Sequence, residues 1–140
     1  MMQLPRGAAP IAALIASLAL AACGVVEVLM PPGEARWALA PGAEIGPETT
    51  EFVAMVTEMA CAGGQSSAGR IIGPDISVTD ESITVTFRAR ARSGPATCPG
   101  NPATPVVVEL PEPLGDRTLL DGGTDPPRDP PECADPTFCE

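Results

Sequence analysis

The 140-residue sequence has no histidine, tyrosine or lysine, and all eight of its basic residues are arginines. These absences exclude Ser-His and Cys-His nucleophile pairs, Ser-Lys dyads, lysine Schiff bases and histidine metal ligands. One tryptophan and three phenylalanines provide little aromatic surface for stacking sugars or bases. The composition therefore predicts a protein that is not an enzyme and has no catalytic residues, cofactor or metal.

Acidic residues outnumber basic ones, 18 to 8, which gives a net charge of −10. This excess repels nucleic acid and anionic lipid, so we expect no nucleic-acid partner. An enzyme would have to rely on a pair of carboxylates in a cleft. The candidates for such a pair are Asp80/Glu81 and Glu112/Asp116.

Residues 1–22 predict a lipoprotein signal peptide. An apolar run from Ile11 ends in Leu20-Ala21-Ala22-Cys23, which matches the lipobox of bacterial lipoproteins. We therefore expect acyl chains such as palmitate on Cys23, which would anchor the protein to the outer side of the cell membrane. One alternative is a soluble secreted protein cleaved by signal peptidase I. A membrane span is the other, but the run covers roughly 16 residues and a bilayer requires about 20.

Four cysteines remain if Cys23 is lipidated: Cys61, Cys98, Cys133 and Cys139. In an oxidising compartment an even number predicts disulfides, for which three connectivities are possible. We favour Cys61–Cys98 with Cys133–Cys139, because the last two share one flexible segment. The first pair would close a long loop, which stabilises a fold by about 4 kcal/mol in the chain-entropy model. Without any C-x-x-C spacing, a zinc site is disfavoured.

After a tether at 23–35, residues 36–121 predict a small all-β domain. Its sheet or sandwich would be antiparallel, with about five or six strands. The strands are expected near 36–40, 50–61, 76–78, 83–90, 105–110 and 116–121. Segment 50–61 also fits helical spacing, but its neighbours favour a strand. The proline-rich acidic tail, 122–140, is expected to be disordered apart from any local disulfide loop.

Arg88, Arg90 and Arg92 alternate with apolar residues on the clearest predicted strand, so they should share its solvent face. Three interpretations remain open for these arginines. They could form a solvated face, pair with the acidic tail, or bind an anionic ligand or partner.

The turn Pro113-Leu114-Gly115-Asp116-Arg117 predicts a structural role for its last residue. We expect Arg117 to bind a loop carbonyl or a carboxylate.

The middle of the chain resembles a family of small secreted proteins and lipoproteins of actinobacteria. The residues that carry the resemblance are Val56-Thr57-Glu58-Met59-Ala60-Cys61, Cys98-Pro99-Gly100-Asn101-Pro102, Val106-Val107-Val108-Glu109-Leu110, the Pro113 turn, and Leu119-Leu120-Asp121-Gly122-Gly123. The resemblance implies a β-rich domain and supports Cys61 and Cys98 as partners. It implies no catalytic residues.

Together these features predict an envelope-anchored lipoprotein that binds another envelope protein or has a structural role. The alternative is a binder of small anionic ligands through Arg88, Arg90 and Arg92. The sequence itself identifies no partner, ligand, biological process or oligomeric state.

Overall fold

The computed structural model of the protein describes residues 30–135 and 138–139. Six strands form there: β1 (Gly33–Leu39), β2 (Glu51–Glu58), β3 (Ile71–Val78), β4 (Ser82–Ala89), β5 (Thr104–Glu109) and β6 (Thr118–Asp121). In this part of the chain no helix is long and apolar enough to cross a membrane. The predicted signal peptide and Cys23 lie outside the described residues.

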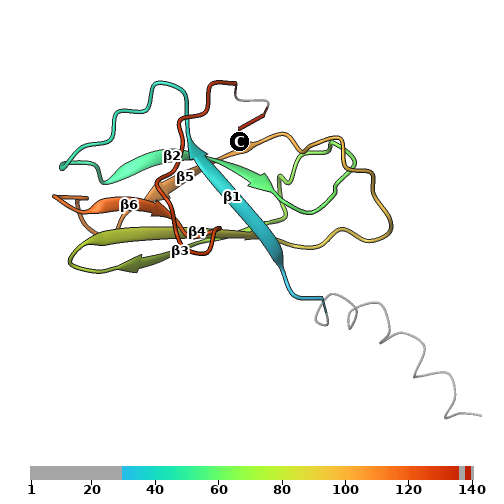
Figure 1. Ribbon diagram of the computed structural model, residues 1–140, viewed down its shortest axis with the longest axis horizontal. Coiled ribbons are helices and arrows are strands. Elements are labelled where there is room, and N and C mark those ends of the chain that lie inside the picture. The colour runs from blue at the N-terminus through green and yellow to red at the C-terminus, as the bar shows by residue number, and fades with distance from the viewer. Residues whose placement is uncertain (1–29, 136–137, 140) are drawn as a thin grey trace, which may run out of the picture. The chain divides into compact units, whose positions relative to one another are not determined.

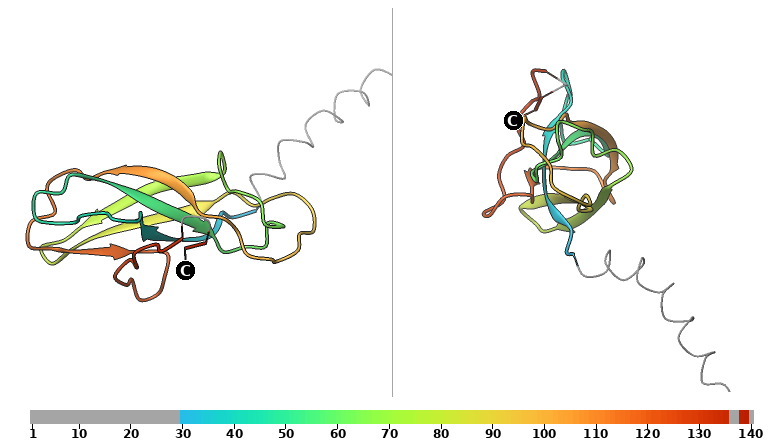
Figure 2. Two further views of the ribbon diagram at one scale, coloured as in Figure 1. Left: turned by 90° about the horizontal axis from the view of Figure 1, so that it is seen from above. Right: turned by 90° about the vertical axis from the view of Figure 1, so that its right-hand side faces the viewer.

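The strands form a single sheet in the order β3-β4-β1-β2-β5, in which all neighbours are antiparallel (Figure 1). β6 lies off this path and pairs in parallel with β4. The predicted all-β fold with five or six strands is therefore confirmed. Viewed end-on, the strands curl around a common interior (Figure 2, right).

The core follows from alternation along β2 and β4. Because successive side chains point to opposite faces of a strand, every second residue enters the interior. Trp37 packs there against Phe52, with ring centroids 5.3 Å apart, and is only 2% exposed. The buried residues of this core are Ala35, Trp37, Phe52, Ala54, Val56, Ile83, Val85, Phe87, Val108, Leu110, Leu114 and Leu119.

The ambiguous segment 50–61 contains strand β2, as predicted. Its helical spacing arises because β2 is buried on both faces. Val56 enters the main core, whereas Met55 packs on the opposite face against Ala38 and Cys133. The valine run of β5 belongs to an edge strand, in which Val108 is buried and Val107 is 57% exposed.

Strands β1 and β6 both pair with the same edge of β4, each with a different part of it. β1 pairs with β4 only over Gly33–Ala35, and β6 then pairs with the other part of β4, Ser82–Val85. Where β1 leaves, the Val85 carbonyl accepts hydrogen bonds from Trp37 Nε1 (2.8 Å) and from the Gly122 backbone N–H (3.0 Å). The carboxylate of Asp121 accepts the backbone N–H of Trp37 (3.4 Å), a group that has lost its strand partner.

The segment after Asp121 is ordered over the described residues, so the predicted disordered tail is wrong there. We call residues 122–135 and 138–139 the strap. The Leu39 N–H donates to the Pro131 carbonyl (2.8 Å), and the Cys133 N–H donates to the Leu39 carbonyl (2.9 Å). The composition of the strap did not predict that it is ordered, because it contributes no buried residue to the main core. Backbone hydrogen bonds to β1 hold it instead.

Several predicted boundaries also shift. β3 begins at Ile71, five residues before the predicted start, and β2 ends at Glu58, before the predicted end at 61. β1 begins at Gly33, inside the predicted tether, because β4 provides a pairing partner for residues 33–35. β6 begins at Thr118, after the turn. Within that turn Arg117 donates to the carbonyls of Leu114 (2.9 Å) and Pro113 (2.6 Å) and pairs with Glu112, so its predicted structural role is confirmed.

Gly123 lies against the edge of β1 and has no space for a side chain. A Cβ there would be 2.1 Å from the Ala35 carbonyl oxygen, a backbone atom that cannot rotate away. We expect Gly123→Ala to destabilise the domain by about 3 kcal/mol, the upper end of the usual overpacking range. For a domain of this size, thermal denaturation should show a fall in Tm of more than about 10 °C.

Gly46→Ala is the matched control, because a Cβ at Gly46 meets no atom within 4 Å. It should change stability by less than about 0.5 kcal/mol. Equal Tm values for the two variants would show that the strap does not pack against Ala35 at Gly123.

Candidate functional site

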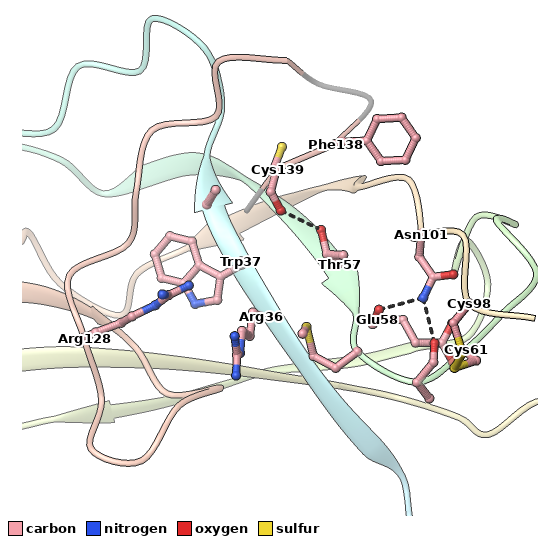
Figure 3. A pocket seen from close by; sticks show the side chains of 14 residues that line it. Arg36, Trp37, Thr57, Glu58, Cys61, Cys98, Asn101, Arg128, Phe138 and Cys139 are labelled. Carbon is pink, nitrogen blue, oxygen red and sulfur yellow. Dashed lines mark hydrogen bonds between the residues drawn. A yellow bond between two sulfur atoms is a disulfide. The ribbon is translucent and has the colours of Figure 1, made fainter.

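A cavity of about 510 Å³ opens on the outer face of β1 and β2, the face turned away from the main core (Figure 3). Its floor includes Arg36 of β1 and Thr57 of β2, which are directly paired in the sheet. Because side chains alternate, Arg36 and Ala38 point outward while Trp37 between them enters the core. The same alternation therefore builds the core and the floor of the cavity.

The strap covers one side of this floor. Cys133 is 2% exposed and packs on Ala38 and Met55. The Thr57 hydroxyl donates a long hydrogen bond of 3.5 Å to the Cys139 carbonyl. Phe138 lines the cavity and is 55% exposed. The strap thus brings part of the predicted tail over the outer face of the sheet.

The loop that carries Cys98 forms the opposite wall. Asn101 is 91% buried, and its Nδ2 donates to the carbonyls of Glu58 (2.8 Å) and Ala60 (2.7 Å). A disulfide joins Cys61 to Cys98 with Cα atoms 4.6 Å apart. Both attachments hold this loop against the end of β2.

The second disulfide joins Cys133 to Cys139, so both pairs are those expected from the sequence. The sequence separations are 37 and 6 residues. In the chain-entropy model these loops give about 4 and about 2 kcal/mol of stabilisation. Cys61, Cys98 and Cys139 all line the cavity, so both covalent links lie at its border.

Two arginines line the cavity, Arg36 on β1 and Arg128 on the strap. Arg128 is positioned by a backbone bridge, in which the Asp121 N–H donates to the Arg128 carbonyl (2.7 Å) and the Arg128 N–H donates to the Asp121 carbonyl (3.2 Å). Within the described part of the chain, neither guanidinium forms an ion pair.

The carboxylate that lines the cavity, Glu58, is already neutralised. Arg70 Nη1 donates to Glu58 Oε1 (2.8 Å) and Arg70 Nη2 pairs with Glu58 Oε2. The hydrogen bond to Glu58 raises the pKa of Arg70, which keeps this pair charged. Asp121 is the other nearby acid. It is fully buried and interacts electrostatically with both Arg128 and Arg36.

Two buried polar atoms of the lining residues have no hydrogen-bond partner: Arg36 Nε and Asn101 Oδ1. A buried donor or acceptor without a partner costs roughly 1–3 kcal/mol. Both atoms are themselves buried, although their residues line the cavity, and the described fold leaves their hydrogen-bonding capacity unused.

The three arginines predicted as a binding surface lie elsewhere. Arg88 on β4 and Arg90 just after it are exposed as expected, but neither they nor Arg92 line the cavity. Arg92 is partly buried and donates to Gln65 Oε1 (2.6 Å). The acidic segment bonds to β1, so the pairing of these arginines with the tail is not observed among the described residues.

Sequence reasoning missed Arg36 and Arg128. Arg36 carried a signal, because it alternates with Trp37 on the first predicted strand. Arg128 carried none, since it lies in a proline-rich segment without periodicity and is placed by its bridge to Asp121. Among the described residues no group of three or more Cys, Asp or Glu side chains could hold a metal ion.

Burial raises the pKa of Asp121 above its ordinary value of 3.8, although hydrogen bonds from Gly123 and Trp37 oppose the shift. The folded protein therefore retains this proton to higher pH than the unfolded chain does. The stabilisation from protonated Asp121 is complete below pH 3.8 and is lost as the pH rises through the raised pKa. We expect the difference in unfolding free energy between the wild type and Asp121→Asn to shrink over this range.

Denaturant unfolding at a series of pH values measures this difference. The variant should be less stable throughout, because an amide can accept only one of the two backbone N–H groups that Asp121 accepts. Two parallel stability curves would contradict the raised pKa.

Comparison with known proteins identifies neither a family nor a function for this chain. No protein-family model matches the chain, and no curated protein or solved structure shows significant similarity to it. The resemblance to small actinobacterial lipoproteins therefore stays a prediction, and the function is argued from the site.

Proposed function

We propose that the protein is a lipid-anchored, non-catalytic binding domain of the bacterial envelope. Cys23 would carry the lipid, and the cavity on the outer face of β1 and β2 would receive the ligand. The observation that carries the proposal is the cavity itself, because it is hollowed next to both disulfides and flanked by separate segments that are each fixed in place. A cavity of this size lies in the range of small-molecule sites.

The arrangement of the acids favours binding over catalysis. The carboxylate pairs available to an enzyme, Asp80/Glu81 and Glu112/Asp116, are exposed and lie outside the cavity lining. Glu58 does line it but is held by Arg70. A general base must reach the substrate proton with a free lone pair. The cavity provides no such base among the described residues.

The lipobox supports the anchor. A domain held at the membrane surface by acyl chains on Cys23 would keep its cavity in the extracytoplasmic space, where disulfides are stable. The ligand would then be an envelope component, either a small molecule or a group carried by an envelope protein.

The test is to express the full chain in a bacterial host that processes lipoproteins, beside Cys23→Ser and Thr57→Trp. The wild type should enter the detergent phase with a diacylglyceryl mass on Cys23, and Cys23→Ser should stay aqueous. Native mass spectrometry of wild type extracted from envelopes should show a bound small molecule. Thr57→Trp, which fills the floor of the cavity, should lose it.

Ser77→Trp is the control for the added bulk, since Ser77 is exposed on the edge strand β3. It should retain the bound molecule. Aqueous partition of the wild type with a signal-peptidase-I mass would overturn the anchor and favour the secreted form. An unchanged adduct in Thr57→Trp would overturn the cavity as the binding site.

A further inference from the structure

Among the described residues, Arg36 and Arg128 form no ion pair with a carboxylate, although the chain has a large excess of acids. The sequence has 18 acidic and 8 basic residues, so carboxylates are abundant. Arg70 and Arg117 each pair with a glutamate, whereas the two cavity arginines pair with none among the described residues. Two unpaired guanidiniums that line one cavity attract an anion.

Backbone pairing fixes the place of both arginines in the fold. Arg36 lies between Ala35 and Trp37 on a strand hydrogen-bonded to β2. Arg128 is fixed through its backbone bridge to Asp121. A preorganised cationic site loses less conformational entropy on binding, which favours affinity.

The nearby negative charges do not cancel this positive pair. Glu58 is neutralised by Arg70. Asp121 interacts electrostatically with both arginines, but its carboxylate already accepts the backbone N–H groups of Trp37 and Gly123. It also forms no ion pair with either guanidinium. Two cations therefore face one buried acid.

One nitrogen of the Arg36 side chain also lacks a hydrogen-bond partner. Its Nε is a buried donor without an acceptor among the described residues. The residue as a whole is partly exposed and lines the cavity. Guanidinium groups match the planar fork of a carboxylate and also bind phosphate. An oxyanion is thus the ligand group that suits these two side chains.

Apolar side chains complete the cavity. Phe138 is 55% exposed and Met59 is 44% exposed, and both line it. An inorganic ion would leave this surface in contact with water, whereas an organic ligand could cover it. The ligand should therefore carry an apolar body beside its charge.

We propose that the cavity binds an organic oxyanion, a carboxylate or phosphate ester with an apolar body, between the guanidiniums of Arg36 and Arg128. This inference rests on the proposed function, because it names the ligand class of the same cavity. In this proposal the anion binds to Arg36 and Arg128, which line one cavity, and not to the predicted surface of Arg88, Arg90 and Arg92.

The test is isothermal titration calorimetry of the disulfide-bonded protein with three probes. N-acetyl-phenylalanine carries a carboxylate, its amide is the neutral match, and phenyl phosphate carries the other oxyanion. We expect at least one charged probe to bind about ten-fold or more tightly than the amide. Arg36→Gln and Arg128→Gln should each weaken that binding about ten-fold.

Arg88→Gln is the matched control, because it removes the same charge from an exposed position outside the cavity. It should leave the affinity unchanged, which separates a local site from the overall charge of the protein. Arg128→Gln keeps the test valid if Arg36→Gln fails to fold, because the Arg128 side chain is exposed and its bridge uses backbone atoms.

The outcomes distinguish this inference from the proposed function. If the amide binds as well as the charged probes and Thr57→Trp abolishes binding, the cavity is a binding site but not for anions. The inference is then wrong and the function stands. If no probe binds and the envelope adduct is absent, both are wrong. Tighter binding of phenyl phosphate than of the carboxylate would identify a phosphate ester as the ligand.

Discussion

The structure depends on how the polar backbone groups along one edge of β1 are satisfied after β4 leaves it. Three different partners occupy that edge in succession. Strand β4 pairs with residues up to Ala35, the carboxylate of Asp121 accepts the N–H of Trp37, and the strap pairs with Leu39. A buried backbone N–H without a partner costs about as much as a lost hydrogen bond. The Asp121 carboxylate therefore accepts the hydrogen bond that a neighbouring strand would otherwise accept from Trp37. This role explains why an acidic residue is fully buried there.

The cavity is a consequence of this succession. The strap runs along this edge of β1 to Leu39 and continues over the outer face, where Cys133 packs on Ala38. Arg128 of the strap and Arg36 of β1 then line the same cavity, and neither forms an ion pair among the described residues. An acidic protein thus has two arginines without ion pairs at one cavity. Of the two disulfides beside it, Cys61–Cys98 holds the loop that carries Cys98 to the end of β2, and Cys133–Cys139 closes a loop within the strap. This contrast between the global and the local charge is the strongest indication of a ligand.

Much of the fold was predictable from sequence because alternation is a local signal. The alternation over residues 83–90 predicted strand β4 and its inward face, and the disulfide pairs were favoured from the spacing of the cysteines. The strap was not predictable, since its order comes from backbone hydrogen bonds to a distant strand and leaves no periodic trace in the composition. For the same reason the sequence drew attention to Arg88, Arg90 and Arg92, which share a visible pattern. Arg36 and Arg128 come together only through the fold.

The most direct test of the account is hydrogen exchange at two backbone amides, Leu39 and Cys133, measured by NMR on the oxidised protein. Both donate hydrogen bonds between β1 and the strap. We expect them to exchange as slowly as the backbone amides hydrogen-bonded between neighbouring strands of the sheet, because the strap is docked in the native state. Exchange at the rate of an unstructured peptide, with the sheet still protected, would contradict it. The strap would then be free and the cavity would lose its Phe138 and Arg128 side.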